Sequence, residues 1–245
     1  MNAESTPVSA EAQWKSYYGR PVIKPPVWEV PDVPAYLYLG GMAGASATIA
    51  LASTCSGRPR LARTARIAST CGSTASVVAL VHDLGRPARF LNMLRVIKPT
   101  SPLSIGSWIL APFSALAAVG TGSAVTGWFP LLGRLSSAAA GVLGPAMTTY
   151  TAVLLSDTAV PAWHEAYREL PFVFAGSAVA SAGALGVLTA PVREAAPARR
   201  MAVAGTALEL LADARTRRRE GVVGAAFRKG RPGTLLRVSR ALSLL

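Results

Sequence analysis

The sequence places a histidine and an aspartate side by side at the end of a long uncharged run, in the stretch HDLGRP. His82 can donate a hydrogen bond and exchange protons near neutral pH, and Asp83 can orient its ring or relay the proton. Gly85 and Pro87 favour a sharp turn, because one tolerates positive φ and the other fixes φ. This turn would bring Asp83 close enough to pair with Arg86. His82 and Asp83 therefore either take part in proton chemistry or close a helix and fix a loop.

Further candidate residues also lie near the ends of uncharged runs. Their side chains can donate hydrogen bonds, carry protons or line an apolar binding pocket. They are Trp28, Tyr36, Tyr150, Asp157, His164 and Glu209. Tryptophan and tyrosine are also expected at the headgroup level of any membrane protein. A carboxyl inside a membrane is a candidate for a proton path, whereas on an interfacial helix Glu209 would be an ordinary polar residue. His164 lies in a surface loop, where it contacts either a partner or solvent.

The elements that carry these residues are those of a membrane protein. The chain is 51% hydrophobic and only 15% charged, and its apolar residues stand in long uncharged blocks. A helix needs about 20 apolar residues to cross a bilayer. Four runs without Asp, Glu, Lys or Arg reach that length, namely 33–57, 99–133, 135–156 and 170–192.

Two further spans are weaker. A helix starting near Leu61 and ending at His82 would reach across the membrane if Arg63 and Arg66 snorkel to its surface. The run 198–212 has arginines at its start and a carboxylate near its end. It predicts either a short span or an interfacial helix. The fold expected is an all-α, polytopic integral membrane bundle of about six transmembrane helices.

Alternating spans bring the candidate residues together. Residues 1–32, the loop 82–102 and the loop 157–169 fall on one side of the membrane, which we call face A. Nearly every unusual polar or aromatic residue lies near that face. The prolines of the first segment favour an extended chain. This segment is either a docking strap for a partner or a rigid linker.

Charge, cysteine and histidine content exclude several classes of protein. The net charge is +13, but nine of the 25 Lys and Arg residues follow Ala212, which favours a basic tail facing anionic lipid. No aromatic or motif pattern supports nucleic-acid binding. Cys55 and Cys71 have no CxxC spacing or histidine neighbour, so they are interpreted as small packing residues. The two histidines lie at helix ends, which argues against heme. The first 32 residues have no apolar core, and no cleavable signal peptide is predicted.

Three stretches carry a family resemblance when taken in order. They are VWEVPDVPAYLYLGGMAGAS, HDLGRPARFLNMLRVIKPTSPLSIGSW and YTAVLLSDTAVPAWHEAYRELPFVFAGSA. Together they resemble the NrfD family, the membrane subunits of polysulfide reductase-type complexes. The resemblance covers roughly residues 28–192.

The resemblance implies a function for the chain as part of a complex. Such a subunit is a heme-free, quinone-reactive anchor in the bacterial plasma (inner) membrane, and is not catalytic by itself. Its partners would be an iron-sulfur ferredoxin-like subunit and a molybdopterin catalytic subunit. A quinone or menaquinone would be its bound substrate, with no heme or metal in this chain.

In such a subunit, the chemistry of the candidate residues suggests a role for each. The residues expected to bind the quinone are Trp28, Tyr36, His82, Asp83 and Tyr150. Those expected to form a proton path are Asp157 and Glu209. Docking of the iron-sulfur partner falls to Tyr17, Tyr18, Arg20, Arg86, Arg89 and His164.

The family usually has eight spans in two four-helix bundles. The organisation expected here is a docking segment (1–32), a first bundle (33–156), a partial second bundle (157–212) and a basic tail (213–245). The chain is expected to be C-terminally short, because Leu245 falls about where a seventh span should begin.

Two other classes of function remain open. One is a purely structural anchor that holds a partner but has lost redox coupling. The other is a cytochrome b-type anchor or a small transporter. The position of the two histidines disfavours the cytochrome, and the lack of paired broken helices with midplane polar groups disfavours the transporter.

Overall fold

The computed structural model describes residues 28, 30–218, 224, 227–228 and 230–243, and their regular structure is helical. The six long helices are α1 (Asp32–Cys55), α2 (Pro59–Asp83), α4 (Pro102–Thr126), α5 (Pro130–Ser156), α7 (Leu170–Thr189) and α8 (Ala196–Arg217). The shorter helices are α3 (Ala88–Met93), α6 (Pro161–Glu165) and α10 (Gly230–Ser243).

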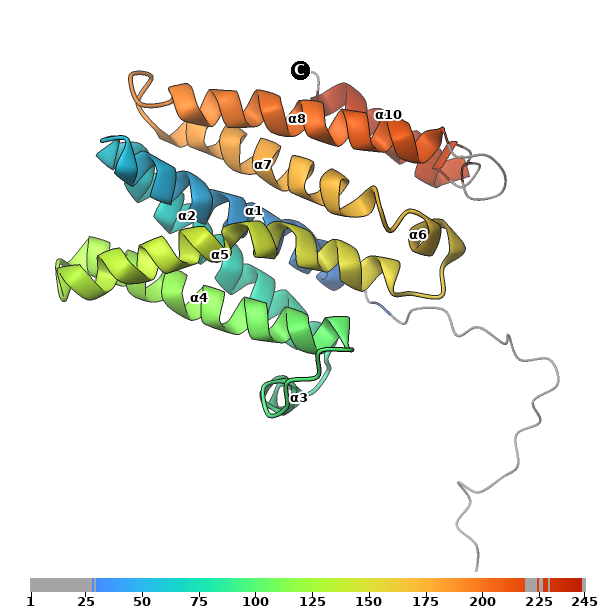
Figure 1. Ribbon diagram of the computed structural model, residues 1–245, viewed down its shortest axis with the longest axis horizontal. Helices are drawn as coiled ribbons and strands as arrows, with labels where there is room; N and C mark the ends of the chain where they lie inside the picture. Colours follow the sequence, from blue (N-terminus) through green and yellow to red (C-terminus); the bar gives the residue numbers. More distant parts are fainter. Residues whose placement is uncertain (1–27, 29, 219–223, 225–226, 229, 244–245) are drawn as a thin grey trace, which may run out of the picture.

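The long helices pack side by side along a common direction (Figure 1). Helices α1, α2, α4 and α5 form a four-helix ring, and the hairpin of α7 and α8 packs against α1 and α5. Successive long helices run in opposite directions. Helices α1, α4 and α7 therefore begin, and α2, α5 and α8 end, at the same end of the bundle, which is face A.

The prediction of a multi-pass, all-helical membrane protein is confirmed in its main lines. Helices α1, α4, α5 and α7 are long and apolar enough to cross a membrane, and they coincide with the four uncharged runs. Helices α2 and α8 have 25 and 22 residues but do not combine this length with the same apolar composition. The count of six spans therefore stays a prediction.

One boundary differs from the sequence-based expectation. The uncharged run 99–133 does not form a single element, because Gly127 adopts φ 77° and ends α4 in a left-handed cap. Helix α5 then begins at Pro130 and contains Arg134 in its first turns, rather than starting after that residue. Proline suits the first turn of a helix because the missing N–H would have no partner there.

Small residues allow the helices to approach closely. A side chain on Gly44 would collide with Met147 and with the Gly144 carbonyl of α5. Gly40, one turn earlier, faces Ser76 of α2 instead. The two glycines of this GxxxG pattern thus serve two interfaces. Glycines 176, 183 and 205 similarly bring α7 and α8 into backbone contact. Such contact stabilises helices where lipid provides no hydrophobic drive between them.

Helix α2 is less apolar than its neighbours because it directs hydroxyl groups inward. Ser69, Ser73 and Ser76 are buried, and Ser76 Oγ donates to the Tyr36 carbonyl at 2.9 Å. Thr70 Oγ1 donates to the Ala117 carbonyl of α4 at 2.9 Å. Arg66 reaches toward the other membrane face, where Nη2 donates to Thr54 Oγ1 at 2.8 Å. Hydrogen bonds between helices thus accommodate Thr70 and Ser76. Ser73 Oγ donates instead to the Thr70 carbonyl of its own helix, and Ser69 Oγ is buried with no hydrogen-bond partner among the described residues.

Candidate functional site

The ends of α1 and α2 are joined at face A by a hydrogen bond between His82 and Asp32. His82 Nδ1 lies 2.6 Å from Asp32 Oδ2, with the two side chains 75% and 17% exposed. Asp32 was not among the sequence candidates, although it opens the first span on the same face. The sequence proposed instead that Asp83 pairs with Arg86. Among the described residues no ion pair joins those two, so that expectation is wrong.

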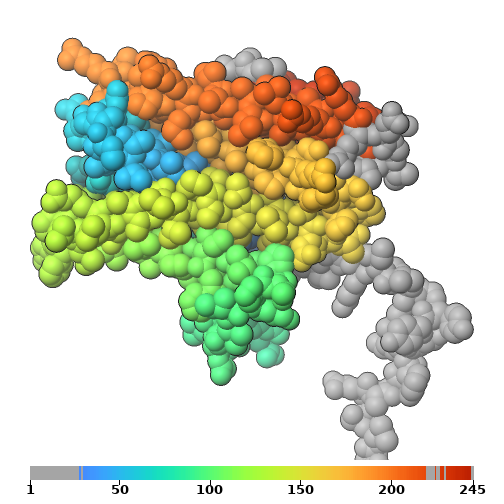
Figure 2. All heavy atoms as spheres, viewed as in Figure 1, coloured from blue at the N-terminus to red at the C-terminus, as the bar shows by residue number. Residues whose placement is uncertain are grey.

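The loop after His82 turns as the sequence predicts. Gly85 has φ 66°, a conformation that glycine adopts without steric cost. Arg86 and Arg89 are exposed, and Arg89 Nη1 donates to the Leu84 carbonyl at 3.1 Å. Figure 2 shows the segment that contains α3, in green, standing out from the flank of the bundle. Leu91 lies on the outer surface of this segment and is 65% exposed. This arrangement suits a helix at the lipid interface.

Tyr36 and Tyr150 meet inside the four-helix ring. Their hydroxyl oxygens are 2.5 Å apart, and the residues are only 3% and 7% exposed. The ring of Tyr150 also packs against Gly106, at a point where no larger residue would fit. The structure therefore brings two predicted quinone ligands together, but each hydroxyl already has the other as its partner.

Trp28 stacks on Trp163 at face A. Their ring centroids are 5.7 Å apart with planes 12° from parallel, and both pack against the apolar cluster of α5 and α7. Trp28 also lines a cavity of about 290 Å³ together with Asp157. His164 is exposed, and its Nδ1 lies 3.0 Å from the Ser156 carbonyl, at the end of α5. The predicted docking residues Tyr17, Tyr18 and Arg20 lie outside the described residues.

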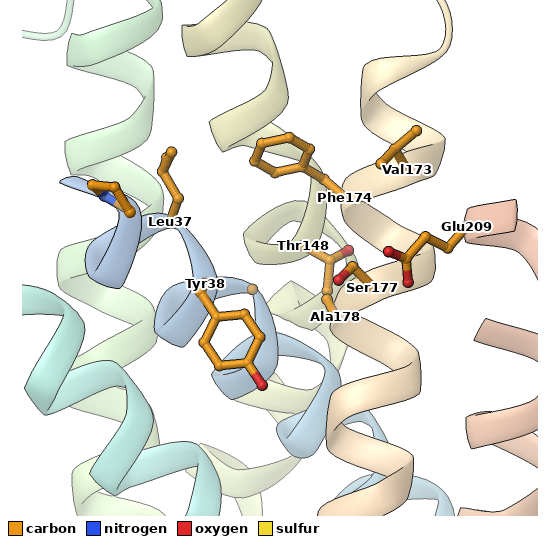
Figure 3. A pocket seen from close by; sticks show the side chains of 10 residues that line it. Leu37, Tyr38, Thr148, Val173, Phe174, Ser177, Ala178 and Glu209 are labelled. Carbon is orange, nitrogen blue, oxygen red and sulfur yellow. The ribbon is translucent and has the colours of Figure 1, made fainter. Parts of the chain in front are cut away.

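A separate pocket of about 280 Å³ lies between α1, α5, α7 and α8 (Figure 3). Its walls are mostly apolar and include Leu37, Val173 and Phe174. Four polar side chains, one from each helix, also line it: Tyr38, Thr148, Ser177 and Glu209. An apolar slot with a few convergent polar groups is the usual form of a small-molecule site.

The four polar side chains share one depth. Tyr38 lies six residues from the face A end of its helix, Ser177 seven, and Thr148 and Glu209 eight each. At 1.5 Å per residue this is roughly 9 to 12 Å below the helix ends. Figure 3 shows the carboxyl oxygens of Glu209 directed toward the hydroxyl groups of Ser177 and Thr148. The structure thus brings four polar side chains to a similar depth around one pocket, with Tyr38, which is 53% exposed, at its outer side.

A second cavity continues from this pocket. It measures about 1000 Å³ and shares Tyr38, Ser177 and Glu209 with the first. Small residues of α7 and α8 form one wall, and Leu235, Val238 and Leu242 of α10 form the other. Helix α10 is held beside α8 by a hydrogen-bonded ion pair between Arg240 and Asp213. The two cavities together form a polar pocket that opens into a long, mainly apolar groove.

The sequence identified Glu209 but not its three companions. Tyrosine near a helix end is expected at the headgroup level of any membrane protein, so Tyr38 does not stand out in the sequence. Residues such as Thr148 and Ser177 are common in packed membrane helices. The signal that was available is their similar distance from face A, six to eight residues counted along four separate helices. The predicted proton-path residues Asp157 and Glu209 are not brought together, because Asp157 lines the cavity beside Trp28. Among the described residues, no group of three or more His, Cys, Asp or Glu side chains could hold a metal ion.

Comparison with known proteins gives one match. A family model described as polysulphide reductase, NrfD, matches residues 22–206. That range holds all six long helices except the last turns of α8, and includes each polar residue of the pocket except Glu209. No curated protein and no solved structure matches the chain.

Proposed function

The chain belongs to the NrfD family of polysulphide reductase membrane subunits, and on this premise we propose that it is the quinone-interacting anchor of a multi-subunit oxidoreductase. An iron-sulfur subunit would bind at face A and connect the chain to a molybdopterin catalytic subunit. The complex would lie in a bacterial plasma membrane.

The observation that supports quinone binding is the pocket between α1, α5, α7 and α8. A quinone has a flat ring with two carbonyl acceptors and a long hydrocarbon tail. The apolar walls suit the ring, and the hydroxyl groups of Tyr38 and Ser177 are donors for a carbonyl. The adjoining groove beside α10 suits the tail. We therefore place the ring in this pocket rather than at the residues expected from sequence, since Tyr36 and Tyr150 face the four-helix ring and Trp28 lines a different cavity.

Glu209 and Thr148 fit the proton chemistry of this substrate. Reduction of a quinone to a quinol takes up two electrons and two protons, and quinol oxidation releases them. The iron-sulfur partner would exchange the electrons, and Glu209 would exchange protons with the ring oxygens. Thr148 Oγ1 donates to the Pro145 carbonyl at 2.7 Å, so its lone pairs remain to accept from a quinol.

Face A supplies the features that a docking partner needs. The His82–Asp32 pair and the Trp28–Trp163 stack fix the helix ends there. Arg86, Arg89 and His164 are exposed around them. Fixed helix ends with exposed charged groups favour association with an acidic partner surface. The exposed His82 can also exchange protons with water on this face.

The test is to isolate the complex through a tag on this chain and to add a short-tailed quinone. We expect iron and molybdenum to co-purify, and decylubiquinone or a menaquinone analogue to reoxidise the reduced clusters. The variant Ser177→Phe should fill the pocket and abolish reoxidation without loss of the partners. The control is Leu188→Phe, because Leu188 lies in the same helix but is 83% exposed. An assembled complex whose clusters no quinone oxidises would show a purely structural anchor.

A further inference from the structure

We infer that the chain holds one anionic phospholipid at face A, in a basic pocket between the ends of α7 and α8. This pocket measures about 560 Å³ and lies apart from the quinone pocket and its groove. Its lining residues belong to the turn before α7 and to the two helices. None of the candidate residues for redox or docking lines it.

The charges of the pocket suit a phosphate group. Three arginines line it, Arg168 before α7 and Arg215 and Arg218 at the end of α8, together with one carboxylate, Glu169. All three arginines are exposed. Within the described part of the chain, Arg215 and Arg218 form no ion pair, whereas the neighbouring Arg217 is paired with Asp213 at 3.0 Å. The excess of positive charge therefore attracts an anion.

The apolar residues of the same pocket suit a lipid rather than a free phosphate ion. Phe172, Leu208 and Leu211 line it and are 57%, 36% and 67% exposed. Phe172 lies in the first turn of α7, and the leucines lie six to nine residues before the end of α8, on the membrane side of the arginines. Cations at the level of the headgroups with apolar surface directly beneath match a phosphate joined to an acyl chain. Basic pockets between membrane helices bind acidic lipid headgroups in this manner.

Arg168 is held in position to take part. Its Nε donates to the hydroxyl of Tyr167 at 2.8 Å, and its guanidinium lies 5.4 Å from the centre of that ring. These contacts leave the other guanidinium nitrogens available as donors. Arginine binds phosphate oxygens through two parallel N–H groups, which gives the headgroup a defined place. The site is therefore built from two segments of the chain that the fold brings together.

The experiment compares lipid retention by two double variants of the full chain, each of which removes two charges at one end of α8. One is Arg215→Gln with Arg218→Gln in the pocket, and the control is Arg199→Gln with Arg200→Gln at the opposite end of the helix. Native mass spectrometry in detergent would follow added dioleoyl phosphatidylglycerol, with phosphatidylcholine as the neutral comparison. We expect one phosphatidylglycerol per chain, with roughly 10- to 30-fold weaker binding in the pocket variant and no change in the control.

Two further arms identify the source of the phosphate. Two competitors of dioleoyl phosphatidylglycerol are tested, inorganic phosphate at millimolar concentration and dihexanoyl phosphatidylglycerol. Both should displace the lipid poorly, because neither covers the apolar side chains of Phe172, Leu208 and Leu211. Equal loss of lipid in both double variants would overturn the proposal, since it would mean general attraction to a basic surface. Displacement by inorganic phosphate alone would overturn it as well, by showing a simple anion site. Thermal unfolding of each variant confirms that the compared proteins are folded.

Discussion

At the scale of single residues, Glu209 decides what the pocket between the helices can do. A carboxyl group inside a membrane is costly, and such groups mark ion or proton pathways. Glu209 lines both the pocket and the groove, with its oxygens toward Ser177. Structural packing alone would be served as well by leucine or alanine at this position. In the proposed function, this carboxyl exchanges protons with the bound quinone ring.

We expect Glu209→Gln to retain the quinone and lose turnover. The amide keeps the size and hydrogen bonding of the protonated acid but cannot transfer a proton. Loss of a general acid or base lowers turnover by about 100-fold or more. Steady-state quinone reduction by the assembled complex would show a fall in kcat with little change in KM. Glu165→Gln, in the loop at face A, is the matched control and should keep full activity.

Two tyrosines of α1 distinguish the quinone site predicted from the sequence from the pocket found in the structure. Tyr36 points into the four-helix ring, whereas Tyr38 lines the pocket. Tyr38→Phe should weaken quinone binding by roughly 2- to 10-fold through loss of one hydrogen bond. Tyr36→Phe should leave binding unchanged but destabilise the protein by about 1 to 3 kcal/mol, since the Tyr150 hydroxyl loses its buried partner. The opposite result, with quinone affinity lost only in Tyr36→Phe, would favour the site predicted from sequence.

At the scale of helices, the sequence predicts elements better than contacts. Length and absence of charge located the four apolar helices, because the bilayer sets a minimum span. The end of α4 was missed, because Gly127 breaks a run that is apolar on both sides. The pocket was not predicted, since Tyr38, Thr148 and Ser177 are ordinary residues and only their similar distance from face A along four helices relates them in the sequence. His82 was found without its partner Asp32, which is 50 residues away in sequence.

Close packing of α1 on α5 should make Gly44 sensitive to a single added methyl group. A Cβ there would meet Met147 and the backbone of Gly144, so Gly44→Ala should cost about 1 to 3 kcal/mol by overpacking. Gly122 of α4 has open space around it. Gly122→Ala should be neutral or stabilise the helix by about 0.5 to 1 kcal/mol. Thermal unfolding in detergent compares the two, and equal stability of both variants would contradict this packing of α1 and α5.

At the scale of the whole molecule, the alternation of the helices assigns each loop to a membrane face. Cys55 ends α1 and is exposed on the face opposite face A. Ser101 and Ala162 lie at face A, before α4 and within α6. The alternation thus puts the proposed partner face on one side of the membrane and the remaining loops on the other.

An impermeant thiol reagent applied to intact cells tests this topology. In a Cys71→Ser background, Cys55 should differ in accessibility from Ser101→Cys and Ala162→Cys, which should agree with each other. Labelling after the cells are permeabilised gives the total signal for each cysteine, against which accessibility is measured. If Cys55 and Ser101→Cys were labelled from the same side, α2 would not cross the membrane.

The most direct test of the quinone site is photolabelling of the assembled complex with an azido-quinone, followed by peptide mapping. We predict cross-links in α7 around Ser177 and in α8 around Glu209, which disappear when excess decylubiquinone is added or when Ser177→Phe fills the pocket. Cross-links confined to the peptides of His82 and Tyr150, and unaffected by Ser177→Phe, would contradict the assignment of the quinone ring to the pocket between α1, α5, α7 and α8.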